Sequence, residues 1–109
     1  MKNLANQKCI PCEGGMPPMS DDGIVNNLAR LKGWRREQSS ITKNYQRKNF
    51  SDALLLVNKV GELAEIEGHH PDILLHSYKK IRITLSTHAV KGLSVNDFIL
   101  AAKIDEIAG

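Results

Sequence analysis

Histidines are the residues of this chain best suited to chemistry, and all four lie between His69 and His88. The ordinary pKa of histidine, about 6.5, lets the side chain give and take a proton near neutral pH. His69 and His70 are adjacent and precede Pro71, which restricts the backbone before it to an extended conformation. Glu65 lies one helical turn before His69 and could orient an imidazole. This spacing indicates a proton-transfer site.

A metal site and the absence of any site are the alternatives. Cys9 and Cys12 have Cys-x-x-Cys spacing, and with two of the histidines they would make a four-ligand zinc site. More than fifty residues separate the two cysteines from the histidines, which weakens this interpretation. A thioredoxin-like role is weaker still, because Glu-Gly-Gly and Pro-Pro follow Cys12 where that motif would open a helix. In the third interpretation, the histidines lie in loops and have no role.

The composition is that of one small folded domain. The chain has 109 residues, of which 41% are hydrophobic and 25% charged, so it can bury a core and is not disordered or collagen-like. The net charge of +3 is too small to demand a nucleic-acid or membrane partner. The sequence contains no apolar run of membrane-spanning length and no secretory signal. We therefore expect a cytoplasmic protein with no membrane association.

The elements that position the histidines are expected within residues 20–109, the folded domain. Residues 1–19, with the Cys-x-x-Cys pair and several Gly and Pro, form an N-terminal extension that reads as a tail or a strap on the domain. Three amphipathic helices are expected. Their signals are a candidate N-cap at Ser20 with a stop at Gly33, an N-cap at Ser51 with a stop at Gly68, and an N-cap at Ser94.

Four strands are expected, over residues 34–38, 41–48, 73–76 and 78–86. The last of these alternates apolar and polar residues, which indicates one buried face. The predicted fold class is α+β with two layers: a four-stranded antiparallel sheet with helices packed on one face. Its core is β-β-α-β-β-α, preceded by an N-terminal helix. The other sheet face must be solvated or cover a second subunit.

The spacing of the candidate residues forms a longer pattern. Three residues separate Glu65 from the His69-His70-Pro71 motif, nine separate Tyr78 from His88, and eight separate His88 from Asp97. This pattern resembles that of the pterin-4a-carbinolamine dehydratases, also called 4a-hydroxytetrahydrobiopterin dehydratases. Some members of that family carry a similar Cys-x-x-Cys-Glu-Gly-Gly leader.

The similarity extends from about Trp34 to Asp105, with three departures. Lys43 and Arg47 stand where many members have Arg and an aromatic residue, and Gly68 stands where animal members have Asp. Lys43 and Arg47 also share a strand face with apolar residues, so at least part of that face should be wet. The departures affect strand packing and the rim of the pocket.

The resemblance implies a dehydratase, a lyase that removes water from 4a-hydroxytetrahydrobiopterin and gives quinonoid dihydrobiopterin, with no metal and no cofactor. Such members recycle the pterin left by aromatic amino-acid hydroxylases, which would be the metabolic partner. The reaction needs an acid for the 4a-hydroxyl and a base for the N5 proton, each within about 3 Å. The resemblance assigns His69 and His88 as general acids, while His70 binds the pterin and shares the base role.

Four further residues are expected to bind substrate or support the histidines: Glu65, Pro71, Asp97 and Trp34. Asp97 would hold the loop of His88, or would only satisfy backbone N–H groups in the first turn of a helix. Trp34 would stack on the pterin or belong to the core. Tyr78 reads as strand packing.

The expected assembly is a homodimer or homotetramer that does not contact nucleic acid directly. Two other functions stay open. One is a non-catalytic dimerisation or regulatory cofactor, as animal members are for a homeodomain transcription factor. The other is a divergent pterin-binding protein.

Overall fold

The computed structural model describes residues 4–9 and 17–109. Two short 3-10 helices, η1 and η2, accompany three α-helices and four strands. In chain order the elements are η1 (Leu4–Asn6), α1 (Asp21–Leu28), β1 (Arg35–Glu37), β2 (Ser40–Gln46), α2 (Phe50–Glu67), β3 (Asp72–His76), β4 (Lys80–Leu85), η2 (His88–Val90) and α3 (Val95–Ala108).

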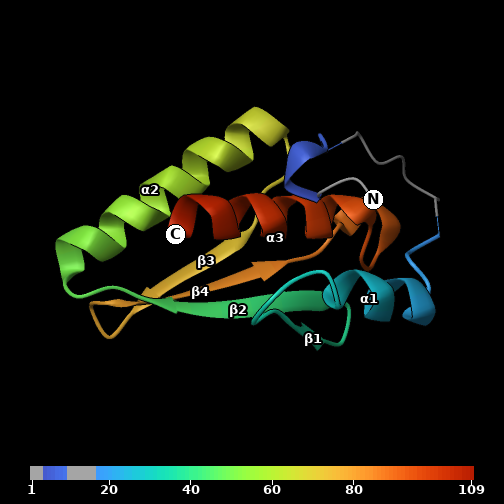
Figure 1. Ribbon diagram of the computed structural model, residues 1–109, viewed down its shortest axis with the longest axis horizontal. Helices are drawn as coiled ribbons and strands as arrows, with labels where there is room; N and C mark the ends of the chain where they lie inside the picture. The colour runs from blue at the N-terminus through green and yellow to red at the C-terminus, as the bar shows by residue number, and fades with distance from the viewer. Residues whose placement is uncertain (1–3, 10–16) are drawn as a thin grey trace.

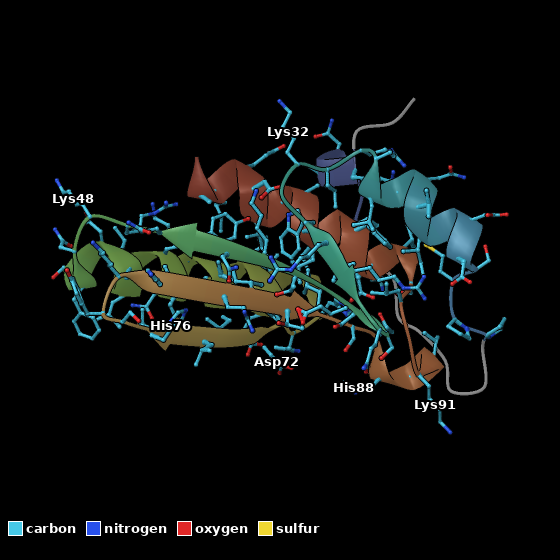
Figure 2. All side chains as sticks on the ribbon, turned by 90° about the horizontal axis from the view of Figure 1, so that it is seen from below. Lys32, Lys48, Asp72, His76, His88 and Lys91 are labelled. Atoms are coloured by element: carbon cyan, nitrogen blue, oxygen red, sulfur yellow. The ribbon has the colours of Figure 1, made fainter. Side chains whose placement is uncertain are left out.

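The four strands form one antiparallel sheet in the order β1-β2-β4-β3. Helices α2 and α3 lie on the same face of the sheet (Figure 1). Seen from below, the strands lie in front of these two helices (Figure 2). The predicted α+β architecture is therefore confirmed.

Register places the apolar side chains of the strands under the helices. Ile41 pairs with Leu85, and Ile73 pairs with Ile83. Because side chains alternate across a strand, these residues point to one face, and they join α2 and α3 in the core. Of these four, only Ile73 is not fully buried.

Three local predictions are corrected. Helix α1 ends at Leu28 and does not extend to Gly33, because a turn follows it. Gly33 takes the left-handed conformation, with φ of 81°, only after this turn. Asn49, not Ser51, caps α2, since its side chain accepts the backbone N–H of Asp52 at 2.8 Å. Tyr78 lies in the β3–β4 turn with φ of 52° and is exposed, so it does not pack in a strand.

Helix α3 is more deeply buried than a single apolar stripe predicts. Residues 96–101 are all buried along with Ile104, whereas Ile107 near the end of the helix is exposed. The reason is the N-terminal segment: η1 packs on α3, and Leu4 is only 3% exposed. The sheet, α2 and η1 therefore enclose the first half of α3. Within the described ranges, no helix is long and apolar enough to cross a membrane.

Candidate active site

The end of helix α2 positions the first two histidines. Gly68 terminates the helix in the left-handed conformation, with φ of 67°, as the sequence predicts. The backbone N–H of His69 still reaches back to the carbonyl of Ala64 at 3.2 Å. The chain thus leaves the helix at once, and His69 and His70 stand between its C-terminus and the first residue of β3.

The loop after β4 positions His88. Thr87 and Gly92 pair as an isolated antiparallel bridge, with hydrogen bonds of 2.7 and 3.3 Å between their backbones. Lys91 closes the turn inside this bridge in the left-handed conformation, with φ of 55°. His88 opens η2 within the closed loop, and Figure 2 shows it beyond the end of the sheet, near Lys91.

Asp97 joins these two segments from the first turn of α3. Its side chain is fully buried, and its Oδ1 lies 2.6 Å from Nε2 of His69. Its Oδ2 accepts the hydroxyl of Thr87 at 2.7 Å and the backbone N–H of Ser94 at 3.0 Å. The carboxyl therefore caps the helix and also fixes His69 and the residue next to His88. The two roles expected for Asp97 are thus combined in one side chain.

The hydrogen bond to Asp97 sets the tautomer of His69. An ionised carboxylate only accepts hydrogen bonds, so beside an ionised Asp97 the donor in this hydrogen bond is Nε2 of His69. Nδ1 is then the ring nitrogen that can exchange a proton with a ligand. The His69 side chain is 12% exposed, so the ring is held on one side and remains accessible on the other.

Three predicted histidines line one cavity of about 420 Å³, a size in the usual range for small-molecule sites. The cavity lies where the end of α2, the β4–α3 loop and the N-terminal segment meet. Its lining residues are Cys9, Glu67, Gly68, His69, His70, Ser86, Thr87, His88, Ala89 and Asn96.

Glu65 pairs with His70 and not with His69. Its Oε1 lies 3.6 Å from Nε2 of His70, and the two side chains are 80% and 62% exposed. An ion pair this open to water contributes little to stability. His70 is therefore free to turn toward a ligand. Pro71, half-buried, follows directly and leads into β3.

Trp34 and His76 lie away from this cavity. Trp34 is 7% exposed and belongs to the core, where its Nε1 donates to Asp105 at 3.1 Å. Asp105 also binds Nζ of Lys43 at 2.8 Å and the hydroxyl of Tyr45. His76 lies at the end of β3 beside Lys80 and Arg82, and it does not line the histidine cavity.

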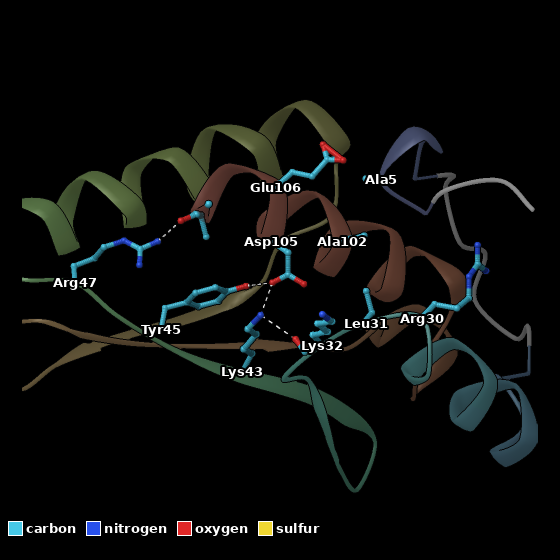
Figure 3. Close-up of a pocket in the computed structure, with 12 residues that line it drawn as sticks. Ala5, Arg30, Leu31, Lys32, Lys43, Tyr45, Arg47, Ala102, Asp105 and Glu106 are labelled. Carbon is cyan, nitrogen blue, oxygen red and sulfur yellow. Dashed lines mark hydrogen bonds and ion pairs between the residues drawn. The ribbon is translucent and has the colours of Figure 1, made fainter.

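The Asp105 cluster borders a second and larger groove, of about 620 Å³. Figure 3 shows Lys43 and Tyr45 converging on Asp105, while Arg47 reaches the backbone carbonyl of Ala108 at 2.6 Å. In this groove Lys43 is paired with Asp105, and no histidine is among the lining residues. The smaller cavity is therefore the better candidate for proton transfer.

No group of three or more His, Cys, Asp or Glu side chains suited to a metal ion occurs in the described part of the chain. Cys9 does lie in the wall of the histidine cavity, but Cys12, the other cysteine of the zinc hypothesis, lies outside the described residues. Burial and the neighbouring charge of Glu67 raise the pKa of the Cys9 thiol to about 12, so the thiol is protonated at neutral pH.

Sequence reasoning missed four polar residues of the site: Glu67, Ser86, Thr87 and Asn96. Thr87 shares Asp97 with His69 and also contacts the hydroxyl of Ser94 at 2.8 Å. The Ser94-x-x-Asp97 spacing, which is typical of a helix cap, could have indicated Thr87. It places the Asp97 carboxyl at the start of a helix, so the partners of that carboxyl must lie near the same helix end.

The fold and the cavity together define a small α+β protein with a histidine-lined binding site. Residues 17–107 match the model of the family described as pterin 4 alpha carbinolamine dehydratase. The chain belongs to this family. A relative from Alkaliphilus metalliredigens is 47% identical over 108 residues, which cover 97% of this chain and 96% of the relative. A relative from Rubrobacter xylanophilus is 39% identical over 108 residues, which cover 98% of this chain and 100% of the relative. Both are named, provisionally, as dehydratases of this kind.

Two solved structures share the fold. A protein from Brucella melitensis, described as a transcriptional coactivator/pterin dehydratase, aligns with a TM-score of 0.79 at 29% identity, covering 84% of this chain and 99% of its own. A pterin dehydratase-like protein, described as a RuBisCO assembly factor in the alpha-carboxysome, aligns with a TM-score of 0.58 at 19% identity. The alignment covers 70% of this chain and 87% of that protein. The second likeness is one of fold alone.

Proposed function

We propose that this chain is an enzyme that dehydrates 4a-hydroxytetrahydrobiopterin to quinonoid dihydrobiopterin in tetrahydrobiopterin recycling. The observation that carries the proposal is the 2.6 Å hydrogen bond between buried Asp97 and His69, in a cavity that His70 and His88 also line. Family membership supports a pterin as the substrate.

The reaction balances with two proton transfers. An acid protonates the 4a-hydroxyl, the C4a–O bond breaks and water leaves. A base takes the N5 proton, and the electron pair of the N5–H bond forms the C4a=N5 double bond. One histidine can supply each transfer, and neither step needs an oxidant. We assign the acid role to His69 and His88, which approach the hydroxyl from opposite sides, and we assign pterin binding and a share of the base role to His70.

The hydrogen bonds of Asp97 support the assignment of His69. A carboxylate on one side of the ring stabilises the charged imidazole that forms when the histidine holds an extra proton. It also keeps the ring from rotating, so Nδ1 stays directed to one position. His88 is exposed on a loop whose preceding residue is tied to the same carboxylate, and this loop would be ordered when a ligand fills the cavity.

The test is the dehydration rate of the 4a-carbinolamine, generated by an aromatic amino-acid hydroxylase as the metabolic partner, with His69→Ala, His70→Ala and His88→Ala. We expect kcat/KM to fall by about a hundredfold or more for His69 and His88, the usual contribution of a general acid. His76→Ala is the matched control and keeps its rate, since His76 lies outside the cavity. A folded wild-type chain that does not accelerate dehydration would contradict the proposal.

The second candidate is a non-catalytic dimerisation or regulatory role, or binding of a different pterin. The description of the Brucella melitensis protein includes coactivation, and the exposed apolar residues Leu54, Leu55 and Ile66 on α2 offer a surface for assembly. We propose a cytoplasmic homodimer or homotetramer. The His70→Ala variant distinguishes the two roles. A non-catalytic cofactor still acts on its protein partner after this substitution, whereas an enzyme loses its activity.

A further inference from the structure

The segment of residues 4–9 is built into the domain. Leu4 is 3% exposed and belongs to the hydrophobic core, and η1 packs on α3. Figure 1 shows η1 beside the C-terminal end of α2 and over α3, although it comes from the other end of the chain. A segment anchored in this way can shape what it covers.

Cys9, at the end of this segment, is attached to the last turn of α2. Its backbone N–H donates to Oε1 of Glu67 at 3.1 Å, and its thiol lies 3.6 Å from the carbonyl of Asn96. The other carboxyl oxygen of Glu67 binds Nζ of Lys103 at 2.9 Å, with the two side chains only 9% and 16% exposed.

The ion pair keeps Glu67 available as an acceptor. Burial alone would raise the pKa of the Glu67 carboxyl, but the hydrogen bonds from Lys103 and from the Cys9 backbone outweigh it and lower the pKa. Glu67 is therefore charged at neutral pH and holds helix α3 on one side and Cys9 on the other.

This attachment has a consequence for the histidine cavity, because Glu67 and Cys9 both line it together with His69, His70 and His88. We propose that residues 4–9 anchor Cys9 in the wall of the pterin site and that Cys9 limits the space beside the histidines. The inference rests on the function proposed above. The family model matches residues 17–107 and so does not include residues 4–9.

The test enlarges the residue at the wall in steps. Cys9→Leu and Cys9→Trp add increasing bulk at the cavity wall, and Cys9→Ser, which keeps nearly the size of the cysteine, is the starting point of the series. We expect KM for the 4a-carbinolamine and the dissociation constant of 7,8-dihydrobiopterin to rise along this series, by about tenfold or more for Cys9→Trp. The value of kcat should change by less than about threefold, because the histidines are untouched.

Lys8 gives the matched control. It is the neighbouring residue, it is exposed and it does not line the cavity. Lys8→Leu and Lys8→Trp place the same two side chains outside the cavity and should leave both constants unchanged. If Cys9→Trp does not fold, Cys9→Leu against Lys8→Leu keeps the comparison.

The outcomes separate the two proposals. If the enzyme is active and neither KM nor the dissociation constant differs between the Cys9 and Lys8 series, the proposal that Cys9 limits the site is wrong. The proposed dehydratase function is then unaffected. A wild-type chain that is folded but neither dehydrates the carbinolamine nor binds 7,8-dihydrobiopterin overturns both. A rise in KM confined to the Cys9 series supports both.

Discussion

Asp97 and Asp105 lie on the same helix, α3, and each accepts hydrogen bonds from three groups. Asp97 receives His69, Thr87 and the backbone of Ser94. Asp105 receives Lys43, Tyr45 and Trp34.

The two carboxylates differ in what their partners can still do. The donors on Asp105 come from β2 and from the residue before β1, so this cluster ties the sheet to the end of α3. None of its three partners exchanges protons readily near neutral pH. Asp97, in contrast, holds an imidazole that has a second ring nitrogen. Of the two carboxylates, Asp97 is therefore the one whose partner has a second ring nitrogen that can exchange a proton with a ligand.

The cavities beside them lead to the same conclusion. The groove at Asp105 is larger, about 620 Å³ against about 420 Å³ at the histidines. Size alone would select the groove at Asp105, whose lining contains no histidine. The side chains that face the space, and the groups that orient them, decide the assignment.

Asp97→Asn should have the largest effect of the changes that compare the two acids. The amide can keep the bonds to Thr87 and Ser94 with its oxygen, but it presents an N–H group to His69. The charged imidazole that His69 needs to act as an acid carries a proton on both ring nitrogens, so it cannot accept this N–H group, and it also loses the carboxylate that stabilises its charge. We expect kcat to fall by about a hundredfold or more, measured with the in situ carbinolamine assay.

Asp105→Asn is the matched control, since it makes the same chemical change on the same helix. An equal loss of kcat in both variants, with both folded, would show that the two acids do not differ as argued. Nitrogen chemical shifts of His69 in the Asp97→Asn chain report the tautomer directly.

Much of this difference was accessible from the sequence. The glycine stop at Gly68, the paired histidines after it and the Ser94-x-x-Asp97 cap are local patterns, and each stands in the structure where the sequence predicts. Local patterns also fixed the fold class, because strand alternation and helix stripes both follow from burial of one face.

The Asp105 cluster was not accessible in the same way. Lys43 and Arg47 on a half-apolar strand face indicated only that water should reach part of it. The acid that binds Lys43 lies 62 residues further along the chain, and no local pattern links them. The sequence left two positions open for Trp34, on the substrate or in the core. The reason is the same, because the partner of Trp34 is also Asp105, far along the chain. The docking of residues 4–9 over α3 likewise depends on tertiary contacts.

Asp105→Asn should itself have an intermediate effect, on stability. The substitution removes the negative charge that Lys43 binds. Because the Lys43 side chain is only 20% exposed, water replaces this partner only in part. Losing a hydrogen bond to a charged group costs about 1 to 3 kcal/mol, so the free energy of unfolding should fall by that amount. Urea denaturation measures it. A loss of stability below about 0.5 kcal/mol would mean that the cluster does not tie the sheet to α3.

Tyr45→Phe should have the smallest effect, and it depends on pH. Burial, together with the hydrogen bond and the charge of Asp105, raises the pKa of the Tyr45 phenol far above its ordinary value of about 10. The folded chain therefore keeps this proton when the unfolded chain loses it, so the stabilisation is complete below about pH 10 and is lost as the pH rises further.

We expect Tyr45→Phe to cost about 1 kcal/mol at pH 7, the usual value of one hydrogen bond. Its free energy of unfolding should then fall less steeply than that of the wild type as the pH rises above about 10. Urea denaturation at a series of pH values measures both. Tyr78, the other tyrosine, is exposed in the β3–β4 turn, so Tyr78→Phe is the control and should follow the wild-type curve. Parallel curves for Tyr45→Phe and the wild type would mean that Asp105 does not hold the phenol proton, and the contrast with the proton-exchanging partner of Asp97 would lose its basis.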